Sequence, residues 1–188
     1  MMKRAMVCAV LLLCAVSLNT GLGEASLREP AETGNARIAA EVTIRRDTYG
    51  VPHILAKTEE AAAFGLGYAQ AEDHCLTIAR RLTAARGEIA KYLGQGVEND
   101  FLMKRFDNLE VCRQNFGQLD PLLQRIFNAY AAGVNHYVSK HHQELPGWIP
   151  VFDGVDVLAN GRAGAVNSAI DLETIRALKA KYPDNPQS

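Results

Sequence analysis

The fold of this chain is decided by the stretch Arg46-Asp47-Thr48-Tyr49-Gly50-Val51-Pro52-His53-Ile54. Gly50 indicates a tight turn, because glycine readily adopts the positive φ that many turns require. Residues 51–56 predict a strand after the turn, and Pro52 must lie at its start or on a sheet edge because proline has no N–H to donate. Before the turn, apolar and polar residues alternate over 42–45, the pattern of a half-buried strand. The sequence therefore predicts a β-hairpin.

A second informative block, Phe64-Gly65-Leu66-Gly67-Tyr68-Ala69-Gln70-Ala71-Glu72-Asp73, follows the hairpin. It begins in a helix that we expect from about Glu59 to Gln70, with Thr58 as the N-cap. The two glycines of the block would weaken a helix, so they predict close packing against another backbone. Its two adjacent carboxylates should point to different sides of a helix. We therefore expect them to make structural hydrogen bonds or ion pairs and not a general acid/base pair.

A longer helix is predicted from about Ala71 to Leu93, with Gly94 as its C-cap. Apolar residues at steps of three and four predict one buried stripe along it, formed by Cys75, Ile78, Leu82, Ala85, Ile89 and Leu93. Basic residues lie largely outside this stripe and predict a solvated face, namely Arg80, Arg81, Arg86 and Lys91.

The C-terminal half predicts further helices. The clearest begins at Asp120-Pro121, where Asp is a good N-cap and Pro a good first residue, and it ends at His141-His142. An irregular connector follows over Pro146–Pro150. The remaining expected helices are one over 98–108, one starting within 153–159 and interrupted at Gly161 and Gly164, and one beginning with a capping box at Ser168 and stopping before Pro183.

The first residues have the pattern of a targeting signal. Two basic residues precede an apolar run over 5–18, and Gly23-Glu24-Ala25 supplies the small residues that signal peptidase requires. The run is too short to cross a hydrocarbon core of about 30 Å as a helix. We therefore expect cleavage near Ala25, no stable membrane insertion, and a periplasmic or secreted protein. A lipoprotein is the less favoured alternative, because a leucine precedes Cys14 where a small residue is expected.

The expected organisation is a signal peptide over 1–25, a flexible mature N-terminus over 26–38, one domain over 39–183 and a polar tail over 184–188. The domain keeps Cys75 and Cys112. An exported protein could join them in a disulfide. The place of Cys75 on the apolar stripe favours a packed thiol, and both alternatives stay open.

Composition and spacing exclude several kinds of site. The formal net charge of −1 gives no electrostatic basis for binding nucleic acid. The histidines lack the spacing of a zinc site, and no Gly-x-Ser-x-Gly motif is present. Gly65-x-Gly67 lacks the third glycine of a dinucleotide-binding turn. A metal-dependent hydrolase remains a minor alternative, which a chelator would test. On residues alone, the chain is an exported α+β or mainly helical domain.

The two blocks together resemble the penicillin acylase (penicillin amidase) family of N-terminal-nucleophile hydrolases. The resemblance extends from about Glu41 to Tyr182 and is strongest before Gly94. The residues Thr83–Glu88 and Cys75 are more similar to acyl-homoserine-lactone and aculeacin-type acylases than to penicillin G acylase. Two further segments contribute to the resemblance, Arg86-Gly87-Glu88 with Tyr92-Leu93-Gly94, and Ala131-Ala132-Gly133-Val134-Asn135.

The resemblance implies a fold and a division of labour. Family members are exported as precursors that cleave themselves into a short α chain and a long β chain, which associate in one αββα fold. The β chain begins with a serine whose hydroxyl attacks the amide and whose α-amine serves as the base. An α-amine has a pKa near roughly 7.7–8.0, which suits this role. This chain would be the α-chain portion, mainly helical with a short hairpin, and its partner would be the β chain of the same precursor.

The resemblance also implies roles for single positions. We expect no catalytic residue here, because Ser168 follows Asn167 and does not match the family's cleavage junction. Arg162 matches an arginine that the family offers to the substrate pocket, and a solvated loop arginine is the alternative. The small residues 163–165 would leave room for a longer acyl chain. The calcium-ligating glutamate of the family falls at Ala169, which cannot ligate. We therefore expect no cofactor and no metal, unless Asp171 or Glu173 replaces that ligand in the full enzyme.

Two alternative functions are consistent with the residues and with the resemblance. The first is the α-subunit or N-terminal fragment of an acylase that hydrolyses N-acyl substrates such as acyl-homoserine lactones, lipopeptides or penicillins. The second is a truncated or repurposed exported helical domain with no catalysis. An obligate α chain made alone should aggregate or lose fixed packing, whereas a repurposed domain should unfold cooperatively by itself.

Overall fold

A computed structural model of the 188-residue chain describes residues 29–169 and 180–181. The chain divides into two compact units, residues 1–37 and 38–188, and the second contains the hairpin and all helices from α2 onward. Helix α1 spans Glu29–Ala39. No helix was expected over these residues, and the expected flexible segment over 26–38 stays a prediction. Alanine, glutamate and arginine favour helix, and proline is tolerated in a first turn. The expected signal peptide and polar tail lie outside the described residues.

The predicted β-hairpin is present. Strands β1 (Val42–Arg46) and β2 (Pro52–Ala56) pair antiparallel, with Ile44 opposite Ile54. Pro52 begins β2, as expected, and Gly50 in the turn has a φ of 81°.

Helix α2 spans Glu59–Ala85 and replaces the two helices expected on either side of Gln70. Thr58 caps it, because its hydroxyl accepts a hydrogen bond from the N–H of Ala61 at 3.1 Å. The helix kinks at His74, where φ is −145° and ψ is 37°. It ends eight residues earlier than predicted, because Gly87 turns the chain with a φ of 67°.

The rest of the predicted stripe continues on a separate short helix, α3 (Ile89–Leu93), which Gly94 terminates with a φ of 66°. Helices α4 (Val97–Arg105) and α5 (Asn108–Phe116) follow. Helix α4 corresponds to the helix expected over 98–108, whereas α5 was not predicted.

Helix α6 spans Pro121–Lys140 and begins as predicted, with the Asp120 carboxylate accepting from the N–H of Leu122 at 2.7 Å. Helix α7 (Gly154–Ala169) runs unbroken through both glycines that were expected to interrupt it. The expected helix start at Ser168 is wrong, because its hydroxyl donates to the backbone oxygen of Gly164 inside α7 at 2.9 Å. Residues 170–179 of that expected helix, including Asp171 and Glu173, lie outside the described residues, whereas residues 180–181 are helical.

Helices α2 and α6 pack backbone to backbone. A Cβ on Gly67 would collide with the backbone oxygen of Tyr130, and one on Gly133 would collide with that of Phe64. The predicted backbone contact is therefore confirmed for Gly67. Gly65 instead faces side chains of the hairpin, where a Cβ would lie 2.6 Å from Val42 Cγ1. Close helix contact needs glycine at such positions.

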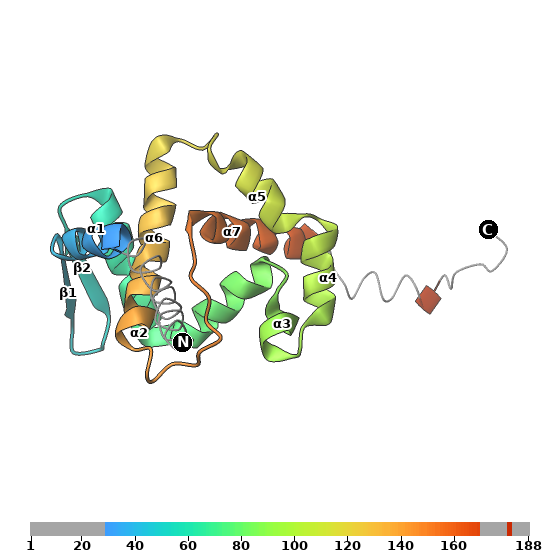
Figure 1. Cartoon of the computed structure of the whole chain (residues 1–188), viewed down its shortest axis with the longest axis horizontal. Coiled ribbons are helices and arrows are strands. Elements are labelled where there is room, and N and C mark those ends of the chain that lie inside the picture. Colours follow the sequence, from blue (N-terminus) through green and yellow to red (C-terminus); the bar gives the residue numbers. More distant parts are fainter. Residues whose placement is uncertain (1–28, 170–179, 182–188) are drawn as a thin grey trace, which may run out of the picture. The chain divides into compact units, whose positions relative to one another are not determined.

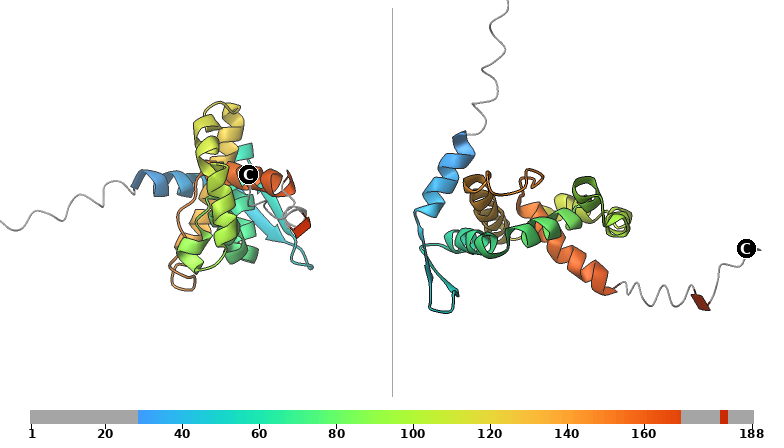
Figure 2. Two further views of the ribbon diagram at one scale, coloured as in Figure 1. Left: turned by 90° about the vertical axis from the view of Figure 1, so that its right-hand side faces the viewer. Right: turned by 90° about the horizontal axis from the view of Figure 1, so that it is seen from below.

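Within the second unit, the helices form one packed assembly beside the hairpin. Helix α2 extends from the hairpin toward α3 and α4, and α7 lies between α6 and the α4–α5 pair (Figure 1). The hairpin lies beside the first half of α2 in the turned views as well (Figure 2). Three buried clusters form the core; their centres include Val134 with Leu82, Met103 with Cys112, and Phe64 with Ala129.

Both cysteines of the domain are buried free thiols, Cys75 on α2 and Cys112 on α5. Burial raises the pKa of each thiol, which keeps it protonated and unreactive. Among the described residues, no helix combines the length and the apolar character that a membrane span requires.

Candidate functional site at the junction of α2, α5 and α7

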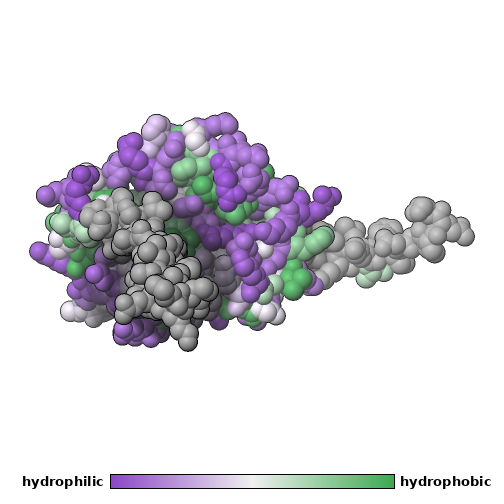
Figure 3. All heavy atoms as spheres, viewed as in Figure 1, coloured by the Kyte–Doolittle hydropathy of each residue, from purple (hydrophilic) through white to green (hydrophobic). Residues whose placement is uncertain are grey.

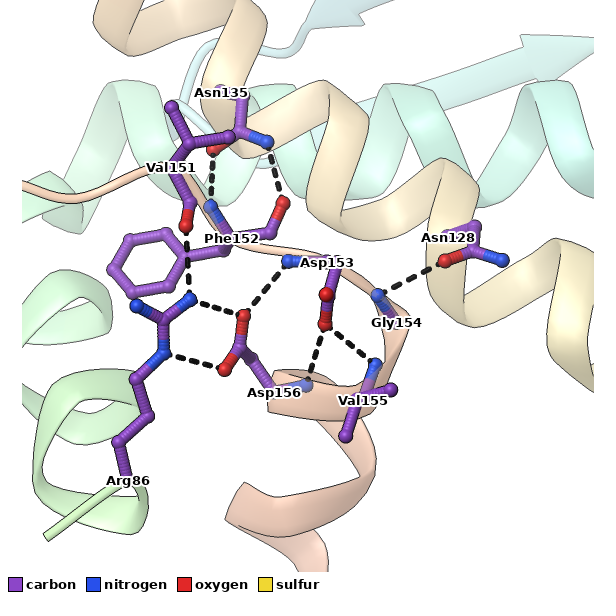
Figure 4. Close-up of polar contacts among 9 residues, drawn as sticks. All are labelled: Arg86, Asn128, Asn135, Val151, Phe152, Asp153, Gly154, Val155 and Asp156. Carbon is purple, nitrogen blue, oxygen red and sulfur yellow. Dashed lines mark hydrogen bonds and ion pairs between the residues drawn. The ribbon is translucent and has the colours of Figure 1, made fainter. Parts of the chain in front are cut away.

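The C-terminal end of α2 is tied to the start of α7 by an ion pair. Arg86 Nε donates to Asp156 Oδ1 and Arg86 Nη2 to Asp156 Oδ2, both at 2.5 Å (Figure 4). The Asp156 side chain is 3% exposed and that of Arg86 16%. Hydrogen bonds to the carboxylate raise the pKa of Arg86 above its usual value. The predicted solvated face is therefore wrong for Arg86.

The same arginine also holds the segment that leads into α7. Its Nη2 donates to the backbone oxygen of Val151 at 2.8 Å. Its guanidinium lies over the ring of Phe152, 5.1 Å from the centroid, in cation–π contact. A planar guanidinium can make all these contacts at once, whereas a lysine ammonium cannot. Arg86 therefore positions the start of α7.

Two aspartates cap α7 reciprocally. Asp153 Oδ1 accepts from the N–H groups of Val155 and Asp156, at 2.9 and 3.2 Å. Asp156 Oδ2 accepts from the N–H of Asp153 at 2.8 Å. This arrangement is a capping box built with aspartate at both positions, and it satisfies N–H groups that a helix start leaves free. Asp156 thus both caps α7 and pairs with Arg86.

Helix α6 holds the connector before α7 through two asparagines. Asn135 binds both backbone groups of Phe152, donating to its oxygen at 2.7 Å and accepting from its N–H at 3.0 Å (Figure 4). Asn128 Oδ1 accepts from the N–H of Gly154 at 3.0 Å. Four segments therefore meet at this junction with their polar groups paired.

Arg162, the predicted substrate-binding residue, lies on α7, one part of this junction. Its Nη1 donates to Asn108 Oδ1 at 2.8 Å. Asn108 is buried and donates from Nδ2 to the backbone oxygens of Ala85 and Ala159, each at 2.9 Å. One amide therefore joins the end of α2, the start of α5 and the middle of α7, and it orients Arg162.

The half-buried Arg162 guanidinium has no other hydrogen-bond or ion-pair partner among the described residues. An arginine has five N–H donors in a rigid fork, so the remaining ones are available to an acceptor from outside this part of the chain. Arg162 lies on α7 and not on a loop, and its expected role in a substrate pocket stays a prediction. The side chain is anchored on one edge and open on the other.

The other expected positions near Arg162 are partly described. Ala163 is buried, whereas Gly164 and Ala165 are exposed. Ala169 is the last residue of α7, and the possible substitutes Asp171 and Glu173 lie outside the described residues. Within the described part, no group of three His, Cys, Asp or Glu residues could hold a metal ion.

A second polar cluster ties the hairpin to α2. Arg46 Nη2 lies 2.5 Å from Glu72 Oε2 and 2.9 Å from Asp73 Oδ1, so both carboxylates converge on one guanidinium. The expected ion pairs are present, but the expectation that the carboxylates diverge is wrong. The kink at His74 follows them directly, and the regular helical spacing ends there. These hydrogen bonds raise the pKa of Arg46. We assign this cluster a structural role.

The hairpin turn is organised by Asp47. Its Oδ1 accepts from the N–H groups of Tyr49 and Val51, at 2.9 and 3.0 Å, and its Oδ2 lies 3.3 Å from His53 Nε2. The hydrogen bond from Val51, with that from His53, lowers the pKa of Asp47. The stretch Arg46–Ile54 therefore specifies a turn and, through Arg46, the attachment of the hairpin to α2. None of the contacts described for this stretch pairs a nucleophile with a base.

The sequence prediction missed Asp156 and Asn108, which organise the junction. The Asp153–Asp156 spacing was a usable signal, because an acceptor three residues after another acceptor marks a helix start. Nothing local indicated Asn108, whose partners lie 23 and 51 residues away.

Comparison with known proteins gives one family. The model of the penicillin amidase family matches residues 41–183. The acyl-homoserine lactone acylase QuiP of Pseudomonas aeruginosa is 34% identical over 110 residues, 58% of this chain and 13% of that protein. The penicillin acylase 2 proenzyme of Pseudomonas sp. strain SE83 is 34% identical over 103 residues, 54% of this chain and 13% of the proenzyme.

A longer match is the acyl-homoserine lactone acylase PvdQ of Pseudomonas savastanoi pv. phaseolicola, 30% identical over 160 residues, 77% of this chain and 20% of that protein. This chain thus spans a fifth or less of these curated relatives. Among solved structures, a thermostable penicillin G acylase from Alcaligenes faecalis matches with a TM-score of 0.62 and 24% identity. The match covers 76% of this chain and 85% of the compared chain. This likeness confirms the predicted fold class, mainly helical with a short hairpin.

Proposed function

The chain belongs to the penicillin amidase family, and from this membership we propose that it is the α-chain-like part of an acylase that hydrolyses the amide bond of N-acyl substrates. One observation carries the proposal. The fold of this chain accounts for 85% of one chain of a penicillin G acylase, yet its sequence matches span only 13–20% of the curated relatives. A short chain of this fold beside a much longer remainder is what a two-part enzyme would contain.

The proposed division of labour leaves the chemistry to the remainder. Its first residue is a serine, whose hydroxyl attacks the amide carbon while its α-amine takes the proton. The present chain contributes position and shape. Arg162, anchored by Asn108 and open on its other edge, offers guanidinium donors to the bound substrate or to the second chain. The pairing of Arg86 with Asp156 fixes the start of the helix that carries Arg162.

The proposed substrates are amides with an extended acyl group. Curated relatives named as acyl-homoserine lactone acylases and one named as a penicillin acylase support this class. The small residues after Arg162 on α7 favour room for a longer chain over an aromatic ring. We place the enzyme outside the cytoplasm, and the junction after Ala25 is the expected cleavage point of its signal.

The test uses the chain together with the segment that follows it in its gene, expressed with an affinity tag on this chain. We expect a long second chain to co-purify, and the pair to hydrolyse decanoyl-homoserine lactone faster than a phenylacetyl amide. The reverse preference would overturn the acyl-chain assignment only. Hydrolysis by the present chain alone would overturn the division of labour.

The non-catalytic alternative also has support in the structure. Three buried apolar clusters form from residues of this chain alone, and the buried side chains of Asp156 and Asn108 find their hydrogen-bond partners within it. A domain that folds by itself requires such a core. Urea unfolding of the isolated chain distinguishes the two. A cooperative transition of the isolated chain, with no hydrolysis even when the following segment is co-expressed, favours a repurposed domain. Aggregation that the second chain relieves favours the acylase.

A further inference from the structure

A pocket of about 460 Å³ lies between β1, α2 and α6, and no residue of the Arg86–Asp156 or Arg162–Asn108 pairs lines it. Small-molecule sites commonly measure about 300–1,000 Å³ and are mainly apolar, with a few polar groups. The lining contributes apolar side chains from the strand and from α2, among them Val42, Ile44 and Phe64. The pocket therefore has the size and the lining of a ligand site.

One wall of this pocket is aromatic. The ring of His136 lies 5.6 Å from that of Phe64 and 5.9 Å from that of Tyr68, measured between centroids. Burial, together with the nearby charge of Lys140, lowers the pKa of His136. The imidazole is consequently neutral at physiological pH and belongs to the apolar wall.

The charge at the pocket is positive. Lys140, the last residue of α6, is exposed at the lining, and no carboxylate is among the lining residues. Lys140 makes no ion pair with any residue of the described chain. An unpaired ammonium beside an apolar wall complements a ligand with one anionic group and a hydrocarbon body.

We propose that this pocket binds a monocarboxylate with an apolar body, of which a medium-chain fatty acid is the representative. The carboxylate lies at the Lys140 ammonium, and the hydrocarbon lies against Ile44, Phe64 and the His136 ring. The site is separate from Arg162, and the inference does not rest on the proposed acylase function.

The experiment measures binding of decanoate to the purified protein by calorimetry, below the concentration at which decanoate forms micelles. Lys140→Gln removes the charge without changing the apolar wall, and Lys104→Gln on α4 is the matched control at an exposed lysine. We expect the Lys140 variant to bind decanoate roughly threefold to fivefold more weakly, the upper part of the range for an exposed charge pair. The Lys104 variant should bind like the wild type. Decanol should bind both variants and the wild type equally, because it carries no charge.

Histidine ring resonances locate the ligand independently. Decanoate should shift the His136 signals and leave those of His53, in the hairpin, unchanged. Phenylacetate is the second probe: binding at His136 by either acid supports a carboxylate site, and their affinities distinguish a chain from a ring. Absence of saturable binding by both acids, or equal decanoate affinity in the wild type and Lys140→Gln, would overturn the proposal.

Discussion

The two carboxylate oxygens of Asp156 accept hydrogen bonds from Nε and Nη2 of Arg86, each at 2.5 Å, across 70 residues of sequence. The carboxylate is nearly inaccessible to solvent and also caps its own helix through the N–H of Asp153. The pair therefore couples the end of α2 to the start of α7. The position of Arg162, six residues further along α7, depends on this coupling.

Removing the carboxylate should destabilise the protein strongly. Asp156→Ala leaves Arg86 without its partner in a site where it is 16% exposed, and it also removes half of the capping box. Breaking a buried pair from one side costs about 3–5 kcal/mol, and we expect a value near the lower end because Arg86 keeps some contact with water. Urea unfolding of the purified protein measures this loss.

The control is Glu110→Ala. Glu110 pairs with Arg113 at 2.7 Å, but both side chains are more than half exposed. Such a pair contributes about 0–1 kcal/mol. Equal losses for the two variants would show that Arg86 and Asp156 behave as an ordinary surface pair.

The contact between α2 and α6 should not accommodate an added methyl group at Gly67. Gly67→Ala drives a Cβ into the backbone oxygen of Tyr130, so we expect a loss of about 3 kcal/mol, the upper end for overpacking, or failure to fold. Gly161→Ala on α7 meets nothing within 4 Å and should stabilise by about 0.5–1 kcal/mol, because alanine favours helix. Thermal unfolding of both variants checks the opposite signs. A tolerated alanine at Gly67 would contradict the backbone contact.

Arg162→Ala separates a binding role from a structural one. If the open edge of the guanidinium contacts substrate, kcat/KM of the assembled enzyme should fall about tenfold or more, the effect of one charged hydrogen bond. Arg113→Ala on the exposed face of α5 should leave kcat/KM unchanged. Unchanged kcat/KM in Arg162→Ala, with a lower unfolding free energy, would assign Arg162 to structure alone.

His136 should make stability depend on pH. Its pKa is lowered in the folded state by burial and by Lys140, whereas in the unfolded chain it has the ordinary value of 6.5. The unfolded state therefore binds more protons below that value, and stability falls as pH decreases from about 7 toward the folded pKa. His136→Phe should flatten this dependence, and His142→Phe at the exposed helix end should not. The melting temperature between pH 5 and 8 measures both, and an unaltered slope in His136→Phe would refute the assignment.

The features that depend on residues close together in sequence were predicted correctly. The turn at Gly50, the Thr58 and Asp120 caps and the Gly94 terminus were all readable, because each depends on residues within a few positions. The close approach at Gly67 was also predictable, since glycine inside an apolar helix has few other uses.

The predictions that failed concern contacts between residues far apart in sequence. Arg86 was expected on a solvated face because its partner Asp156 lies 70 residues away. The glycines of α7 were expected to break it, yet α7 packs against α5 and α6, and this packing outweighs the weak propensity of Gly161 and Gly164. Asn108 gave no signal, because its role depends on three segments meeting.

The most direct test of the central claim is N-terminal sequencing of the chain that co-purifies when this gene is expressed with the segment that follows it. The two-part acylase account predicts a second, longer chain whose first residue is serine, and loss of activity when that serine is replaced by alanine. Co-purification of no second chain, with a fully active or a fully inert protein, would contradict it.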